Sequence, residues 1–128
     1  PGREVSVGVV SDVPLGAVEV VPRDEFATYR AKYTTGMEMF FCPPRLPRRL
    51  LDDILELGWK AHVAVGANYY SRIDMRVTQD GRPFILEINT LPGLTPNSWL
   101  PKIAQRVGIS YPGLVRLILA SASLKAAG

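Results

Sequence analysis

The stretch RIDMRVTQDGRPFILEIN, from Arg72 to Asn89, decides the fold. Two runs rich in Ile, Val and Phe flank Asp80-Gly81, a dipeptide typical of the two-residue turn of a β-hairpin. Gly, Pro and Asn close the region on its carboxyl side, where strands commonly stop. We therefore predict two antiparallel strands, Tyr70 to Thr78 and Pro83 to Thr90, joined at this dipeptide.

Four polar side chains share one face of the predicted hairpin. A turn at Asp80-Gly81 pairs Asp74 with Glu87 and Arg72 with Asn89, and the period-two alternation of a strand places all four on one side. The opposite face is predicted to pack on the core through Ile73, Met75, Val77, Phe84, Leu86 and Ile88.

Two carboxylates that face each other across a strand pair need a positive partner. Their Cβ atoms lie about 4.5–5.5 Å apart, and like charges at that separation destabilise a sheet. One interpretation is a solvated face on which Arg72 or Arg76 forms an ion-pair cluster with the acids. The other is a cation site, because two Mg²⁺ ions about 3.5–4 Å apart could be bridged by Glu87, with Asp74 and Asn89 beside it. The hairpin by itself leaves both interpretations open.

The loop LPGLTPNS after the hairpin favours the cation site. Gly93 has no side chain, so backbone N–H groups there can approach a ligand closely. Ser98 or Asn97 is expected to cap the helix that follows, and the free N–H groups of a helix start attract anions. Carboxylates, an arginine and an anion-seeking helix start within thirty residues indicate phosphoryl transfer involving a carboxylate.

The remaining sequence predicts an α+β fold with no clear boundary to a second domain. Strands are expected at 4–10 and 17–21, joined by a turn at 12–16, and a short strand near 38–42. The segment 23–36 is predicted to be irregular or a short helical turn. Helices are expected within 43–66, with Pro47 in the first turn and Gly66 as the stop, from about 98 to 107, and from about 110. The apolar stripe of the first helix would contain Leu51, Ile54, Leu55, Gly58, Ala61, His62 and Val65, with His62 packed rather than catalytic.

Composition narrows the class of protein. With 128 residues, 47% of them hydrophobic and 21% charged, the chain has the length and apolar content of one ordinary domain. It has no apolar run near the ~20 residues of a membrane span. Its single cysteine, Cys42, excludes an internal disulfide and fits a reducing, cytoplasmic compartment. The basic residues behind the net charge of +3 are dispersed apart from Arg45, Arg48 and Arg49, and aromatic residues do not interleave with them. A nucleic-acid patch is therefore a weak hypothesis, and anionic small molecules such as nucleotides suit this charge equally well.

From Arg72 onwards the sequence resembles the carboxy-terminal part of the D-alanine–D-alanine ligases, which are ATP-grasp enzymes. The string E-x-N-T-x-P-G-x-T-x-x-S at 87–98 is its most specific part. Upstream, REVSVGVV at 3–10 and Ala31-Lys32-Tyr33 resemble further family segments, so essentially the whole chain is covered. A biotin-carboxylase-like branch is disfavoured, because Leu91-Pro92 follows E-x-N where that branch typically has an arginine.

The resemblance implies roles around the transferred phosphate. Asp74, Glu87 and Asn89 resemble the ligands of two Mg²⁺ ions, for which Mn²⁺ can substitute, that hold the ATP phosphates. Arg72 resembles the arginine that contacts the transferred phosphate and the tetrahedral intermediate. The backbone N–H of Gly93 would complete an oxyanion site.

Four further roles follow from the same resemblance. Glu4 resembles the glutamate that contacts the nucleotide ribose, and Lys32 a lysine that contacts phosphate. Tyr33 resembles the loop tyrosine that closes over the site, a residue associated with amide-forming rather than ester-forming members. Ser98, with the N–H groups after it, resembles the clamp for the carboxylate of the second substrate.

The implied activity is the ATP-dependent joining of two D-alanines through an acyl phosphate, a step of peptidoglycan precursor synthesis in a cytoplasmic protein that is usually a homodimer. The amino-terminal domain of the family and its first ATP-grasp half have no counterpart here, so 1–128 is expected to be the carboxy-terminal part of an ATP-grasp domain. We expect the isolated chain to be inactive or nearly so. Two alternatives stay open: an ATP-grasp ligase for other amino acids, and a non-catalytic nucleotide-binding remnant.

Overall fold

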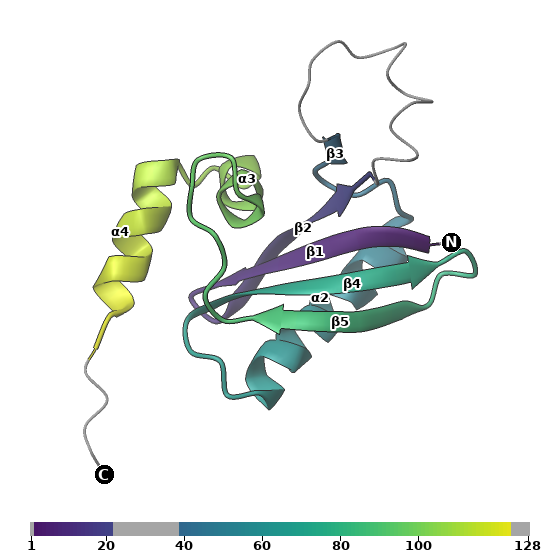
Figure 1. Cartoon of the computed structure of the whole chain (residues 1–128), viewed down its shortest axis with the longest axis horizontal. Coiled ribbons are helices and arrows are strands. Elements are labelled where there is room, and N and C mark those ends of the chain that lie inside the picture. Colours follow the sequence, from purple (N-terminus) through teal and green to yellow (C-terminus); the bar gives the residue numbers. More distant parts are fainter. Residues whose placement is uncertain (1, 22–38, 124–128) are drawn as a thin grey trace.

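The computed structural model describes residues 2–21 and 39–123, and these form one antiparallel sheet with three helices. The elements are β1 (Gly2–Val10), β2 (Val13–Val20), β3 (Phe40–Phe41), α2 (Arg48–Ala64), β4 (Tyr70–Thr78), β5 (Pro83–Asn89), α3 (Trp99–Arg106) and α4 (Tyr111–Ser121). The strand order is β3-β2-β1-β4-β5, and every neighbouring pair is antiparallel (Figure 1). The predicted α+β class, a mainly antiparallel sheet with flanking helices, is confirmed. The expected irregular segment 23–36 lies outside the described residues.

One face of the sheet packs against α2, which lies behind the sheet in Figure 1. Alternate residues of β1 and β4 bury their side chains there, because successive side chains of a strand point to opposite faces. Gly58 lets the helix approach closely, since a Cβ at this position would lie 2.8 Å from Cγ1 of Val7. The buried residues of this core are Val5, Val7, Val9, Ala17, Ile54, Ala61, Ile73, Met75 and Val77.

The other face of the sheet is covered by α3 at one end. A Cβ at Gly8 would lie 2.8 Å from Cδ1 of Leu100, so α3 rests directly on β1. Val10, Leu100, Ala104 and Leu114 form a second buried cluster that joins α3 and α4 to the sheet. The helix leaves the rest of this face, towards β4 and β5, uncovered by any described helix.

The β4–β5 hairpin has the predicted register at its functional end. Asp74 pairs with Glu87 and Arg72 with Asn89, which confirms the prediction. The predicted two-residue turn is wrong. Thr78 N–H donates to the Arg82 carbonyl and Gly81 N–H donates to the Thr78 carbonyl, so three residues form the turn and Gly81 takes a left-handed φ of 81°.

A β-bulge compensates for the longer turn. Met75 pairs with Ile85 while Asp74 pairs with Glu87, so Leu86 is an extra residue on β5. Phe84 and Leu86 are therefore not part of the core face: they are 51% and 61% exposed. Of the predicted apolar face on this strand, Ile88 does pack against the core.

The β1–β2 turn is shorter than predicted. Ser11 and Asp12 both have φ of 56°, and Val10 pairs directly with Val13, as in a two-residue hairpin. The expected turn at 12–16 is therefore mostly strand. Pro14 is accommodated because β2 is at the edge of the sheet there and a register shift follows Gly8.

The helices begin and end close to the predicted positions. Pro47 is the N-cap of α2 rather than part of its first turn, and Gly66, with φ of 67°, follows the C-cap residue Val65 as expected. Val65 itself is 55% exposed and is not part of the buried stripe. Ser110 caps α4 by accepting a hydrogen bond from Gly113 N–H.

His62 is packed, as predicted. It is 1% exposed, its Nδ1 lies 2.7 Å from Oγ of Ser71, and its Nε2 lies 2.8 Å from Oδ1 of Asp12. Asp12 also accepts a hydrogen bond from Tyr69 N–H. The hydrogen bond from His62, followed by that from Tyr69, lowers the pKa of the Asp12 carboxyl. These hydrogen bonds connect the β1–β2 turn to α2 and β4.

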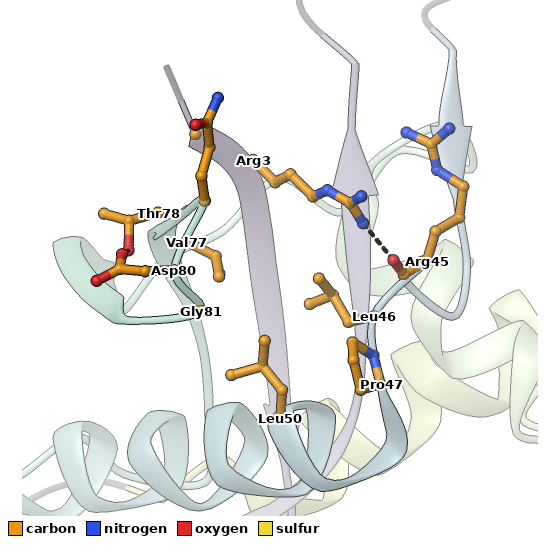
Figure 2. A pocket seen from close by; sticks show the side chains of 11 residues that line it. Arg3, Arg45, Leu46, Pro47, Leu50, Val77, Thr78, Asp80 and Gly81 are labelled. Carbon is orange, nitrogen blue, oxygen red and sulfur yellow. Dashed lines mark hydrogen bonds between the residues drawn. The ribbon is translucent and has the colours of Figure 1, made fainter.

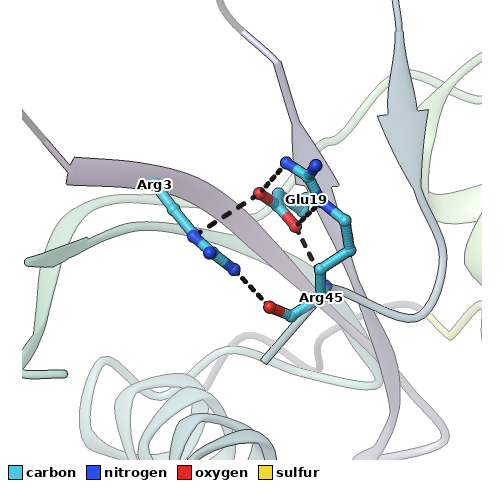
Figure 3. A network of polar contacts seen from close by, with 3 residues as sticks. All are labelled: Arg3, Glu19 and Arg45. Carbon is cyan, nitrogen blue, oxygen red and sulfur yellow. Dashed lines mark hydrogen bonds and ion pairs between the residues drawn. The ribbon is translucent and has the colours of Figure 1, made fainter. Parts of the chain in front are cut away.

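A buried carboxylate joins the amino-terminal strand to the segment that enters α2. Glu19 is 2% exposed and accepts hydrogen bonds from N, Nε and Nη2 of Arg45, at 2.9, 3.2 and 2.8 Å (Figure 3). Nε of Arg3 lies 3.8 Å from Oε1 of Glu19, and the Arg3 guanidinium also donates to the Arg45 carbonyl. Burial alone would raise the pKa of Glu19, but the hydrogen bonds and charge of Arg45, with the charge of Arg3, hold it below the usual 4.5.

Beside this network lies a cavity of about 430 Å³ between the β4–β5 turn and the start of α2 (Figure 2). Arg3 reaches over it towards Arg45, while Leu46, Pro47 and Leu50 form the opposite wall. Arg3 and Arg45 both pair with Glu19, so the network connects β1 and β2 to the segment before α2.

Candidate functional site

A second cavity, of about 270 Å³, opens on the sheet face that α2 does not cover. Its lining comes from β1, β2, β4, β5 and the first residue of α3: Glu4, Val5, Ser6, Val20, Arg72, Asp74, Met75, Leu86, Glu87 and Trp99. Four of the sequence-predicted site residues, Glu4, Arg72, Asp74 and Glu87, are thus brought together at one cavity.

Arg72 and Asp74 form a two-pronged ion pair at this cavity. Nε of Arg72 donates to Oδ1 of Asp74 and Nη2 donates to Oδ2, both at 2.9 Å. The side chains are 19% and 26% exposed, so both can reach a ligand. Such paired hydrogen bonds fix the plane of a carboxylate as well as neutralising it.

Ser6 also binds Asp74 and is a site residue that the sequence did not predict. Its hydroxyl donates to Oδ1 of Asp74 at 2.7 Å, from the directly opposite position on β1. A polar residue between valines in REVSVGVV was the available signal. Its partner could not be read locally, because β1 and β4 are about seventy residues apart in the chain.

Glu87 has no positive partner within the described residues. Arg72 is taken by Asp74, and Arg76 pairs with Glu4 at 2.7 Å. Glu87 is exposed, faces Asp74 across the strand pair, and makes no hydrogen bond or ion pair in the described part of the chain. An exposed carboxylate that has no positive partner and faces a second carboxylate attracts a cation.

Asn89 stands at the end of β5, opposite Arg72. Its side-chain carbonyl Oδ1 accepts a hydrogen bond from Leu91 N–H at 2.9 Å, which turns the chain into the following loop. A carbonyl oxygen has a second lone pair, so this contact leaves Asn89 able to bind one further group.

Gly93 and Ser98 meet in that loop. A Cβ at Gly93 would lie 2.9 Å from Oγ of Ser98, so a side chain at this position would make the serine hydroxyl shift. Ser98 occupies the N-cap position of α3, but the prediction that its side chain, or that of Asn97, caps the helix is wrong. Its hydroxyl is turned towards Thr95, accepting from Thr95 N–H at 3.2 Å and lying 2.7 Å from Thr95 Oγ1. The first N–H groups of α3 therefore receive no side-chain cap.

Two predicted site residues, Lys32 and Tyr33, lie outside the described residues. Across the described ranges, no group of three or more His, Cys, Asp and Glu side chains is placed to hold a metal ion. Asp74 and Glu87 thus supply two carboxylates, and Asn89 a neutral oxygen. This donor set fits Mg²⁺, which commonly combines one or two carboxylates with phosphate oxygens and water.

Comparison with solved structures defines the class of protein. The fold matches the crystal structure of D-alanine–D-alanine ligase from Bacillus anthracis complexed with ATP, with a TM-score of 0.79 and 28% identity, over 94% of this chain and 38% of that one. A second structure of that ligase matches with a TM-score of 0.76. The chain therefore has the ATP-grasp ligase fold over the part that it shares with these structures.

Sequence comparison identifies the family within this class. Residues 1–120 match the family model described as D-ala D-ala ligase C-terminus, and the chain belongs to this family. It is 49% identical over 124 residues to the D-alanine–D-alanine ligase of Citrifermentans bemidjiense, covering 97% of this chain and 41% of the relative. Identity to the Geobacter sulfurreducens ligase is 47% over 128 residues, covering 99% and 40%. The chain therefore spans about two-fifths of the length of these relatives.

No helix in the described part of the chain combines the length and apolar character needed to cross a membrane.

Proposed function

We propose that this chain supplies the metal, phosphate and second-substrate part of a D-alanine–D-alanine ligase that forms D-alanyl-D-alanine for peptidoglycan synthesis. The observation that carries the proposal is the opposed pair Asp74 and Glu87 at one cavity, with Arg72 bound to the first and no described partner for the second. Membership of the ligase family supports the assignment. Residues 1–128 would then be the carboxy-terminal part of an ATP-grasp domain.

Different residues contact different parts of the nucleotide. Glu4 accepts hydrogen bonds from the ribose hydroxyls of ATP, and Lys32 contacts its phosphates. Asp74, Glu87 and Asn89 would hold two Mg²⁺ ions, or Mn²⁺ in their place. The bound ions would neutralise charge on the phosphates. Glu87, as the uncompensated carboxylate, provides most of the electrostatic attraction in the ligand-free protein.

The reaction transfers the terminal phosphoryl group of ATP to the carboxylate of one D-alanine, giving an acyl phosphate and ADP. The amine of a second D-alanine attacks the acyl carbon, and phosphate leaves. Arg72 stabilises the transferred phosphate and the tetrahedral intermediate, and the N–H of Gly93 donates to the oxyanion. Ser98 and the uncapped N–H groups of α3 hold the carboxylate of the second substrate. Tyr33 closes over the site.

These residues act mainly by position and charge. The strands β1, β4 and β5 place Glu4, Arg72, Asp74 and Glu87 around one cavity, so the backbone positions of these groups are set before the ligand binds. A cytoplasmic homodimer is the proposed setting, as the family resemblance implies.

The 128-residue chain alone should show no ATP-dependent dipeptide synthesis, or almost none. It spans about two-fifths of its relatives, and most of the adenine pocket and the contacts to the amine of the first D-alanine are expected in the other part. The measurement is release of ADP and dipeptide from the purified chain supplied with Mg²⁺, ATP and D-alanine. Robust turnover would contradict the proposed division of the site.

A panel of amino acids tests the substrate assignment in the complete polypeptide that contains the chain. Synthesis with D-alanine in preference to other D- and L-amino acids is the expected result. Preference for a different pair would identify a ligase of another specificity. ATP binding without any ligation would identify a nucleotide-binding remnant.

A further inference from the structure

We propose that Ser6 is a positioning residue for Asp74: its hydroxyl keeps the Asp74 carboxylate in place when Arg72 turns from it to the transferred phosphate. The inference rests on the proposed function, because it concerns what happens to the Arg72–Asp74 pair when nucleotide and metal bind. None of the roles implied by the family resemblance involves Ser6.

Ser6 is placed for this role by the sheet itself. Across the uncovered face, one row runs through four adjacent strands, from Val18 to Ser6, Asp74 and Glu87. Ser6 is 7% exposed, and its neighbour Val18 is fully buried and apolar. Oγ of Ser6 donates to Oδ1 of Asp74 at 2.7 Å. The hydroxyl therefore has Asp74 as the polar partner within its row, while Val18 offers it none.

The ion pair in the ligand-free structure competes with the assigned roles of both partners. Arg72 uses Nε and Nη2 on Asp74, the two groups with which it would form a two-pronged contact to a phosphate. Asp74 in turn accepts hydrogen bonds from Arg72 at both oxygens, although it is assigned to a cation. In this proposal the phosphate competes for Arg72 and the cation competes for Asp74, and their binding opens the pair.

Ser6 determines what Asp74 does once the pair opens. Oδ1 then keeps the hydrogen bond from Ser6, whereas Oδ2 loses its described donor. One oxygen thus remains fixed to β1 and the other is released towards Glu87 and a cation. Without the hydroxyl, the freed carboxylate could rotate about its side-chain bonds, and ordering it again would weaken metal binding.

The contribution of Ser6 should be larger in the bound state than in the ligand-free state. In the free protein Arg72 still holds both oxygens of Asp74, so loss of the hydroxyl leaves a partly exposed carboxylate that remains paired. In the bound state Ser6 replaces Arg72 as the anchor. Removal of a group that orients a metal ligand typically weakens metal affinity by about 10–100-fold.

The test uses the complete polypeptide that contains the chain, with Mn²⁺ and a non-hydrolysable ATP analogue as probes. Ser6→Ala removes the hydroxyl, and the pair Ser6→Thr and Ser6→Val compares two side chains of nearly equal shape that differ in the hydroxyl. Ser71→Ala is the matched control, because it removes a fully buried serine hydroxyl that is bonded to His62 on the other face of the sheet. The readouts are Mn²⁺ affinity by electron paramagnetic resonance and the denaturation midpoint without ligand.

We expect Ser6→Ala and Ser6→Val to weaken nucleotide-dependent Mn²⁺ binding by roughly tenfold or more, and Ser6→Thr to restore it. Ser71→Ala should lower the denaturation midpoint and leave Mn²⁺ affinity unchanged. Wild-type Mn²⁺ affinity in folded Ser6→Val, or equal losses in the Thr and Val variants, would overturn the role of Ser6 alone. Absence of nucleotide-dependent Mn²⁺ binding in the wild-type protein would overturn the proposed function and this inference together.

Discussion

Glu87 and Asp74 have the same charge and face each other, yet they differ in their hydrogen-bond partners. Asp74 accepts three hydrogen bonds, from Ser6 and from both prongs of Arg72. Glu87 is exposed and has no partner among the residues that the structure describes. The site thus combines a neutralised acid, which must be released, with a free one, which attracts the incoming cation.

Exchanging the acid and the amide at 87 and 89 tests the metal assignment. Glu87→Gln combined with Asn89→Asp keeps the net charge but moves the free carboxylate to the end of β5. Mg²⁺-dependent ATP binding by the complete polypeptide should weaken by about tenfold or more, because the carboxylate no longer faces Asp74. Calorimetric titration of ATP with and without Mg²⁺ measures this.

Asp80→Asn is the control for this exchange, since Asp80 lies at the exposed β4–β5 turn and pairs with Arg82. It removes a carboxylate that does not line the cavity of Asp74 and Glu87 and should leave ATP binding as in the wild type. Unchanged Mg²⁺-dependent binding in the double variant would count against the metal assignment.

Glu19 should make the stability of the fold depend on acid pH. Its pKa is below 4.5 in the folded chain, so its contribution is fully present above that pH and is lost as pH falls through the lowered folded value. Glu19→Gln should destabilise the chain at pH 7 by about 1–3 kcal/mol, because Arg45 and Arg3 lose their partner. The variant should also lose less stability than the wild type between pH 5 and 3.

Urea denaturation midpoints across this pH range provide the measurement. Glu56→Gln is a suitable control, because Glu56 forms an exposed pair with Lys60 on α2 and such pairs contribute little. Parallel pH profiles for wild type and Glu19→Gln would show that the Arg3–Glu19–Arg45 network does not stabilise the fold as described.

At the scale of elements, the β4–β5 hairpin shows why a local error left the site prediction intact. Asp80-Gly81 correctly marks the turn, but the dipeptide occurs in both two-residue and three-residue hairpin loops. The structure adopts the longer loop, and the extra residue Leu86 restores the pairing before the functional end. At the bulge, two residues of β5 lie opposite one residue of β4. Leu86 and Glu87 therefore both line the cavity beside Asp74.

The contact between α2 and β1 depends on the absence of a side chain at Gly58. Ala is favoured over Gly by about 1 kcal/mol in a helix, but here the new Cβ would lie 2.8 Å from Val7 Cγ1 and 3.0 Å from Val7 Cβ. Overpacking of this kind costs about 1–3 kcal/mol. Gly58→Ala should therefore destabilise the chain despite the gain in helix propensity.

A double-mutant cycle separates the two effects. Val7→Ala removes the obstructing methyl groups, so Gly58→Ala should be less damaging, or stabilising, in that background. Free energies of unfolding for the four proteins measure the coupling. Additive effects would contradict the close approach of α2 to β1.

For the whole molecule, long-range pairing limits what the sequence predicts. Local alternation and turn residues located β4, β5 and their polar face, and the E-x-N string extended this to the ligase family. The pairing of β1 with β4 has no local signal, so Ser6 could not be connected to Asp74. The side chain of Ser98 was also misassigned, because Thr95 competes for its hydroxyl. Lys32 and Tyr33 remain predictions, since they lie outside the described residues.

The positions of the helices leave the Asp74–Glu87 side of the sheet accessible. One face is closed by α2, and α3 covers one end of the other face, so the cavity with Asp74 and Glu87 stays accessible. The chain spans about two-fifths of its curated relatives. We propose that the remaining part of a complete ligase faces this side of the sheet and completes the ATP and D-alanine sites.

Exchange of this chain into a relative tests the central claim most directly. The corresponding segment of the Citrifermentans bemidjiense ligase, 49% identical over 124 residues, would be replaced by residues 1–128, with a Glu87→Gln version as the matched control. The measurement is Mg²⁺-dependent formation of D-alanyl-D-alanine and ADP. The account predicts that the chimaera makes the dipeptide and that the Glu87→Gln chimaera does so at least about tenfold more slowly. A folded chimaera that binds ATP but makes no dipeptide would contradict it.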